Sequence, residues 1–297
     1  MGVRDFSRKM TDPNYPHLKR RKAAYALPTM FTAGSVFLGF FSIMNSFQAA
    51  IQARAGSRGP NALFEVAAIA IVWAMLLDGL DGRIARITNT ASDFGRELDS
   101  LADVIAFGIA PAVLAFAWGI QPAIGSASPP LREYLHRVGI FIPFLYLICG
   151  AARLARFNIQ KNPMPKNPGR ADRKYFVGLP IPAAAALVAA VVYASGGRPL
   201  QYWPLTVAWL GLLALLSFLM VCTWRYQSFK DVQLQRPRSW LLAIPFGVLI
   251  YALWAAPGIA LPLIFGLYVA SGLVVRVGGV LRRRFKRALP QPEQQLG

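Results

Sequence analysis

The chain has very few of the residues that form disulfides or zinc sites. Of its 297 residues, two are cysteine and two are histidine. Cys149 and Cys222 both fall inside apolar runs, so we expect small core residues and no disulfide framework. His17 and His136 are far apart in the chain and are expected at the surface or the membrane interface. Nothing in this composition points to zinc.

Acidic residues are also scarce. The chain has 32 Lys and Arg against 13 Asp and Glu, which gives a formal net charge of +19. Such a balance can indicate nucleic-acid binding, but here the basic residues flank apolar runs and do not line an aromatic-bearing soluble face. We therefore expect no nucleic-acid partner, and we assign the charge to membrane orientation and to contacts with anionic lipids.

Apolar residues are abundant. They make up 55% of the chain, and the mean hydropathy is +0.42. Several runs approach the roughly 20 residues that a helix needs to cross a bilayer. The sequence thus predicts an all-α, polytopic membrane protein with about eight transmembrane helices. The expected spans are 28–50, 63–80, 98–119, 138–155, 179–195, 202–222, 240–256 and 258–276.

The placement of the basic residues predicts the orientation of these spans. With eight spans and a cytoplasmic N-terminus, 27 of the 32 Lys and Arg lie in segments on the cytoplasmic side, as the positive-inside rule requires. The first 27 residues lack the apolar core of a signal peptide, so the first span is expected to be retained. We expect a basic cytoplasmic segment over 1–27, one membrane domain over 28–278 and a cytoplasmic tail over 279–297.

Six of the 13 acidic residues lie between positions 78 and 103. Asp78 and Asp81 are three apart, and Asp99 and Asp103 are four apart, so on helices each pair projects from one face. The two pairs end span 2 and begin span 3, so all four carboxylates are expected at one depth near the cytoplasmic interface. Carboxylates alone, without Cys or His nearby, suit Mg²⁺, Mn²⁺ or Ca²⁺.

The residues around these carboxylates suit a phosphate-bearing ligand. Gly82 and Gly95 remove side chains beside them and let a bulky ligand approach. Arg86 adds positive charge next to the acids, and arginine pairs well with phosphate. Buried, uncompensated carboxylates are costly in a membrane, at about 2.5–3.5 kcal/mol each. A purely structural role for the four is therefore not expected.

Eight positions in this segment match the whole signature of the CDP-alcohol phosphatidyltransferases, a family that the chain resembles. They are Asp78, Asp81, Gly82, Ala85, Arg86, Gly95, Asp99 and Asp103. The stretches 94–103, 107–112, 149–158 and 176–182 look like the serine-using branch of that family. One departure lies in span 1, where the branch carries Pro-Asn and Gly-Asn and this chain has Pro28-Thr29 and Gly34-Ser35.

The resemblance implies a six-helix core with a site at the cytoplasmic leaflet, in the cell (inner) membrane, and a homodimer. It implies transfer of the phosphatidyl group from CDP-diacylglycerol to L-serine, with CMP released. It assigns Asp78, Asp81 and Asp99 to two divalent ions, Mg²⁺ or Mn²⁺, with Ca²⁺ as a substitute in binding. Asp103 is expected as a further ligand and as the general base. Residues expected to hold CDP and phosphate are Gly82, Ala85, Arg86 and Gly95.

Arg153, Arg156 and Asn158 close span 4 on the cytoplasmic side. The two arginines share a helix face, and we expect the three residues to hold the serine carboxylate or a substrate phosphate. The charge rule alone gives another interpretation, in which they only stop the span.

Two other functions are consistent with parts of this pattern. One is a sister transferase whose acceptor is glycerol phosphate, an inositol phosphate or another alcohol, because the eight-position signature does not distinguish acceptors. The other is a cation transporter. A transporter should distribute its acids over several spans near mid-membrane, whereas here they crowd one interface.

Overall fold

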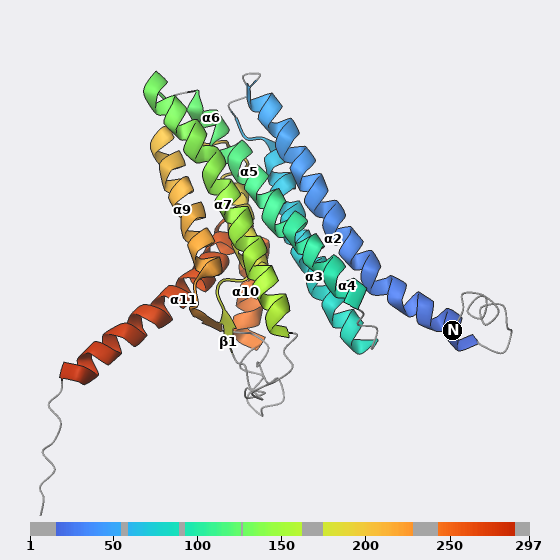
Figure 1. Ribbon diagram of the computed structural model, residues 1–297. Coiled ribbons are helices and arrows are strands. Elements are labelled where there is room, and N and C mark those ends of the chain that lie inside the picture. The colour runs from blue at the N-terminus through green and yellow to red at the C-terminus, as the bar shows by residue number, and fades with distance from the viewer. Residues whose placement is uncertain are drawn as a thin grey trace, which may run out of the picture.

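The computed structural model describes residues 16–54, 59–88, 93–125, 127–161, 175–227 and 243–288. These form a bundle of helices with two very short strands (Figure 1). The helices are α2 (Pro16–Arg54), α3 (Ala62–Ile87), α4 (Asp93–Asp103), the π-helix η1 (Val104–Ile109), α5 (Ala110–Gly119), α6 (Gln121–Ile124), α7 (Pro129–Lys161), α8 (Ile181–Ala194), α9 (Trp203–Val221), α10 (Ala243–Ala255) and α11 (Pro257–Ala288). The strands are β1 (Tyr175–Val177) and β2 (Arg225–Gln227).

Five helical segments are long and apolar enough to cross a bilayer, which confirms a polytopic membrane protein. They are Thr29–Ala53, Ala62–Ile84, Phe94–Ile124, Pro129–Ile159 and Trp203–Val221. Large apolar side chains stand exposed on their outer faces, for example Phe37 at 62% and Phe141 at 56%. An exterior of this kind is stable in lipid and would aggregate in water.

Each of the eight expected spans overlaps a helical segment. Some of these helices are short, so the number that cross the membrane stays a prediction. The segments Ile181–Ala194 and Pro257–Gly272 are apolar but shorter than the five above, and α10 has 13 residues. Helix α2 begins at Pro16, well before the predicted span, and α11 continues to Ala288. Residues 1–15 and 289–297 of the two predicted cytoplasmic ends lie outside the described residues.

The bundle has two ends, which the sequence prediction assigns to opposite faces of the membrane. Helix α6, the end of α2 and the start of α3 lie at one end, and the end of α3, the start of α4 and β1 lie at the other (Figure 1). The prediction assigns the first end to the side that is poor in Lys and Arg, and the second end to the side that is rich in them.

The core of the bundle is built from small side chains on α8 and larger ones on α5 and α9. Seven consecutive residues of α8, Ala184 to Ala190, are buried. Trp118 and Trp209 meet edge to face with ring centroids 5.0 Å apart. The Trp209 indole donates to the Ala115 carbonyl at 3.1 Å. The ring contact and this hydrogen bond hold α5 against α9, and the small residues of α8 let neighbouring helices approach closely.

Directly after Asp103 the helix widens into η1, a π-helix that the sequence does not predict. A Cβ on Gly39 would lie 2.8 Å from Ala106 Cα, so α2 packs against the backbone of η1. A Cβ on Gly108 would lie 2.8 Å from Leu147 on α7. Single π turns occur frequently at functional sites, and this one is held between α2 and α7.

A two-stranded antiparallel sheet joins the segment before α8 to the segment after α9, with Phe176 opposite Tyr226. Gly178 follows β1 with a φ of 79° and donates to the Trp224 carbonyl at 2.8 Å. A Cβ there would lie 2.5 Å from the Met220 carbonyl, so only glycine fits. These contacts fix where α8 begins beside α9.

Candidate functional site

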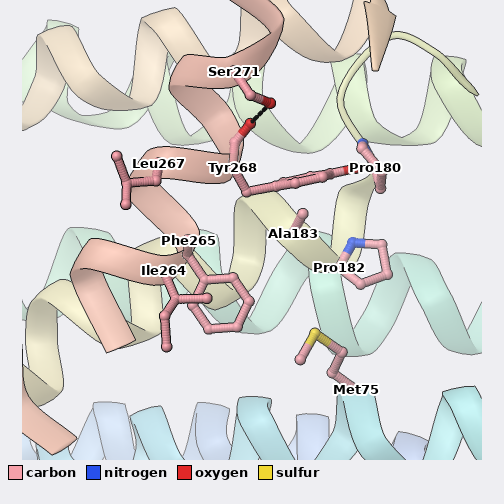
Figure 2. Close-up of a pocket in the computed structure, with 9 residues that line it drawn as sticks. All are labelled: Met75, Pro180, Pro182, Ala183, Ile264, Phe265, Leu267, Tyr268 and Ser271. Atoms are coloured by element: carbon pink, nitrogen blue, oxygen red, sulfur yellow. Dashed lines mark hydrogen bonds between the residues drawn. The ribbon is translucent and has the colours of Figure 1, made fainter. Parts of the chain in front are cut away.

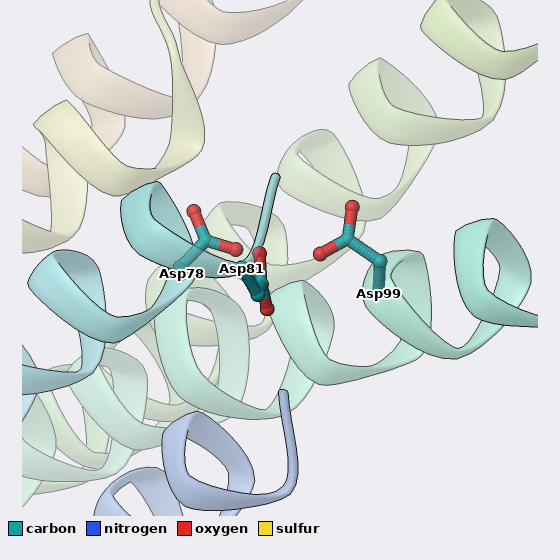
Figure 3. A group of neighbouring side chains, drawn as sticks. All are labelled: Asp78, Asp81 and Asp99. Carbon is teal, nitrogen blue, oxygen red and sulfur yellow. The ribbon is translucent and has the colours of Figure 1, made fainter. Parts of the chain in front are cut away.

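Three of the four predicted carboxylates meet where α3 faces α4. Asp78, Asp81 and Asp99 each offer an oxygen, and these oxygens lie within 4.8 Å of one another. Figure 3 shows Asp78 and Asp81 on one side of this space and Asp99 opposite them. Helices α3 and α4 follow each other in the sequence and run in opposite directions (Figure 1), so the last turns of α3 lie near the first turns of α4. The sequence prediction that the pairs converge is confirmed for these three residues.

The carboxylate trio, Asp78, Asp81 and Asp99, fits a hard divalent cation. Oxygens that bind one Mg²⁺ at about 2.1 Å lie within about 4.2 Å of one another, close to the spread found here. Asp81 is only 4% exposed, and the other two side chains are half-buried. Ionised oxygens this close repel strongly in a poorly solvated site. A cation removes that repulsion, so the trio is a credible metal centre.

Asp103 lies one helical turn beyond Asp99 and is not part of the trio. Its carboxyl lies close enough to that of Asp78 to share a hydrogen bond. Its Oδ1 is buried and has no hydrogen-bond partner among the described residues. Since buried polar atoms are nearly always paired, an unpaired carboxylate oxygen beside the trio indicates a position for a ligand.

Thr32 is a site residue that the sequence analysis missed. Its hydroxyl donates to Asp81 Oδ2 at 2.9 Å from helix α2, 49 residues away in the chain. Both side chains are buried. A hydroxyl in an apolar span is the only sequence signal that could have found it. Three positions later, Ser35 is buried with an unpaired Oγ, at one of the positions where the chain departs from the family pattern.

Arg153 of α7 comes to the same region. It is 9% exposed, and its Nε is buried and unpaired. Its guanidinium lies in the neighbourhood of Asp103 and of Tyr268 of α11, yet in the part of the chain that the structure describes it forms no salt bridge. A buried guanidinium without a carboxylate partner is costly. An anionic ligand in the site would compensate it.

Arg156 and Asn158 have structural partners. Arg156 Nη1 donates to the Val221 carbonyl at the end of α9 at 3.1 Å. Asn158 Nδ2 donates to Ser100 Oγ at 2.7 Å, which ties α7 to α4 one residue after Asp99. Of the three residues predicted for the acceptor, Arg153 therefore has the geometry that best suits a ligand. The roles of the other two stay predictions.

The structure describes the surroundings of two of the four residues that are predicted to hold CDP and phosphate. Gly82 is exposed at the end of α3, and Gly95 is half-buried near the start of α4. Ala85 and Arg86 belong to α3, and their side chains lie outside the described part of the structure. Their roles stay predictions.

An apolar pocket of about 620 Å³ lies between α3, the start of α8 and α11. Met75 lines it from α3, one turn before Asp78. The ring of Tyr268 crosses the pocket toward Pro180, and Ser271 Oγ donates to the Tyr268 carbonyl at 2.6 Å (Figure 2). The remaining lining residues are Pro182, Ala183, Ile264, Phe265 and Leu267. The sequence analysis did not predict this pocket.

Comparison with known proteins places this geometry in context. Residues 25–216 match a family model described as CDP-alcohol phosphatidyltransferase. That segment contains the trio, Asp103 and Arg153, and it ends before α10 and α11.

Several curated relatives cover most of the chain. A protein of Helicobacter pylori named CDP-diacylglycerol–serine O-phosphatidyltransferase is 37% identical over 254 residues, which are 84% of this chain and 90% of that protein. A Bacillus subtilis protein of the same name is 31% identical over 204 residues, which are 69% of this chain and 91% of that protein. An archaetidylserine synthase of Methanothermobacter thermautotrophicus is 32% identical over 172 residues, 57% and 59% of the two chains.

Proposed function

The chain belongs to the CDP-alcohol phosphatidyltransferase family, and we infer that it transfers the phosphatidyl group of CDP-diacylglycerol to the hydroxyl of L-serine. The products are phosphatidylserine and CMP. The observation that carries this conclusion is the carboxylate trio, whose oxygens lie within 4.8 Å of one another inside a complete family signature. Serine as the acceptor is supported by the relatives that match most of this chain.

The trio is the part of the site that we assign to the donor. We propose that Asp78, Asp81 and Asp99 hold two divalent ions, Mg²⁺ or Mn²⁺, with Asp103 as a further ligand. Bound there, such ions would neutralise the pyrophosphate and stabilise the departing CMP. Thr32 fixes the orientation of Asp81 through its hydrogen bond, so the carboxylate faces the ligand without a loss of rotamer entropy on binding.

The end of α3 and the start of α4 would hold the nucleotide part of the donor. Gly82 and Gly95 leave room for the nucleotide, and Arg86 is the residue that we expect on its phosphates. Ala85 completes the same helical turn of α3. The trio lies at the end of the membrane spans, and the pyrophosphate of the donor would bind there. The acyl chains of the donor would then remain inside the bilayer.

Asp103 is our candidate for the general base. It lies one turn beyond Asp99 on the same helix. Its Oδ1 is buried and has no hydrogen-bond partner among the described residues. In the reaction the serine oxygen bonds to the phosphorus of the phosphatidyl group, the bond from that phosphorus to CMP breaks, and the hydroxyl proton goes to Asp103. A base needs hydrogen-bond reach to the hydroxyl. Arg153, buried near Asp103, would hold the serine carboxylate. Arg156 and Asn158 follow it near the end of α7 and would assist in binding the acceptor or a substrate phosphate.

The acceptor is tested directly with purified protein in detergent. CDP-diacylglycerol is supplied with L-serine, glycerol 3-phosphate, inositol 1-phosphate or no alcohol, and CMP and lipid product are measured. We expect CMP release to depend on serine and phosphatidylserine to be the product. Serine-independent release, or a faster reaction with another alcohol, would contradict the assignment.

We propose that the protein is a homodimer, as in the family.

We also propose that both termini and the site face the cytoplasm in the cell membrane. The basic split between the two ends of the bundle supports the orientation. Thr88 and Ser128 are exposed at opposite ends. A cysteine at Ser128 should react with an impermeant thiol reagent on intact cells, and one at Thr88 only after permeabilisation. The unmodified chain, with half-buried Cys149 and Cys222, gives the background. The opposite labelling pattern would reverse the topology.

A further inference from the structure

Helix α11 lies outside the segment that matches the family model, yet it reaches the site. That segment ends at residue 216, whereas α11 begins at Pro257 and packs along α8. Five of the nine residues that line the apolar pocket belong to α11. The last helix is therefore a wall of the pocket beside the trio and not only a membrane anchor.

Tyr268 is the residue of α11 that points toward the acceptor side of the site. Its ring crosses the pocket, and its oxygen lies beside Pro180, at the start of α8 (Figure 2). A Cβ on Gly150 of α7 would lie 3.3 Å from Ile181, the next residue of α8. Arg153 lies one helical turn after Gly150, so the tyrosine and the arginine approach the same corner from two helices.

The chemistry of the two side chains is complementary. The phenol oxygen can accept a hydrogen bond from a guanidinium, and the two groups lie in the same neighbourhood. Arg153 has no salt bridge within the described ranges, and its Nε is buried without a partner. An arginine side chain has many rotamers, and a hydrogen bond to a neighbouring hydroxyl can select one of them.

We propose that Tyr268 is a positioning residue that holds the Arg153 guanidinium toward the carboxylate of the acceptor. The proposal rests on the serine transfer inferred above and extends it by assigning a role in acceptor binding to the C-terminal helix. Tyr268 would not contact the reacting phosphorus. Its effect is therefore confined to acceptor binding, through Arg153.

The test is Tyr268→Phe, which removes one hydroxyl and keeps the ring that packs in the pocket. Because hydrogen bonds to charged groups are stronger than those between neutral groups, we expect the KM for L-serine to rise about tenfold or more. The kcat and the KM for CDP-diacylglycerol should change less than twofold. Tyr251→Phe is the matched control, because Tyr251 is 65% exposed on α10. It should leave all three constants unchanged.

A double-mutant cycle with Arg153→Lys separates positioning from packing. If Tyr268 acts through Arg153, Tyr268→Phe should add little to the KM for serine in the Arg153→Lys background. An unchanged KM in Tyr268→Phe, a fall in kcat alone, or full additivity in the cycle would each overturn the proposal. Any of these results with normal serine turnover by the wild type leaves the proposed function intact. A wild type that does not use serine would refute the proposed function itself.

Discussion

Alanine at Asp81 should reduce turnover by a factor of about 10³ or more. Metal-ion stabilisation of a phosphoryl transfer is worth several kcal/mol, and each 1.36 kcal/mol corresponds to a factor of ten in rate. Asp81 is the most buried member of the trio and is held by Thr32, so no neighbouring water can replace its oxygens easily. Asp78→Ala and Asp99→Ala should have effects of similar size. Initial rates of CMP release measure the loss.

Removal of the metal should reproduce this loss in the wild type. Excess chelator should abolish CMP release, and added Mg²⁺ or Mn²⁺ should restore it. Calorimetry should show weaker, metal-dependent CDP-diacylglycerol binding in each Asp→Ala variant. Glu133→Ala is the matched control, because Glu133 is an exposed carboxylate at the opposite end of the bundle that pairs with Arg137. Full activity in excess chelator would rule out the metal centre.

Asparagine at Asp103 should lower kcat by a factor of about 10² or more while CDP-diacylglycerol affinity changes far less. The amide keeps the size of the side chain but cannot accept the serine proton, and general-base catalysis typically contributes 10²–10⁴-fold. The loss should therefore appear in kcat and in kcat/KM together. Rates measured beside calorimetric affinities separate the two quantities.

Asp99→Asn provides the comparison, since Asp99 belongs to the trio and Asp103 does not. The Asp99 variant should lose donor affinity and rate together. If Asp103→Asn behaves in the same way, Asp103 acts mainly as a metal ligand. A near wild-type rate in Asp103→Asn would remove this residue from the mechanism.

The carboxylate cluster could be predicted from the sequence because its geometry is local. Asp78 to Asp99 are joined by one short reversal between two helices, so the spacing along each helix fixes most of the arrangement. The helices themselves followed from apolar runs, which in lipid have no alternative that satisfies the backbone. The number of spans stays a prediction, because α8 and α10 have only 14 and 13 residues, fewer than a helix needs to cross a bilayer.

The contacts that complete the site depend on tertiary packing. Thr32 and Asp81 are 49 residues apart, and Tyr268 follows Arg153 by more than a hundred. No periodicity in the sequence records such distances. The π-helix is a similar case: residues 104–109 are uniformly apolar apart from Gly108 and read as ordinary helix. What distinguishes them is the close approach of Gly39 and Leu147.

The residues of the site come from separate parts of the chain, and this separation has an evolutionary consequence. The trio and Asp103 come from one stretch of 26 residues, whereas Arg153 reaches them from α7. If Arg153 holds the acceptor as proposed, mutations in α7 would alter the recognition of the incoming alcohol while the carboxylates proposed for phosphoryl chemistry are inherited unchanged. A duplicated gene could diverge toward a new lipid head group in this way without passing through an inactive intermediate.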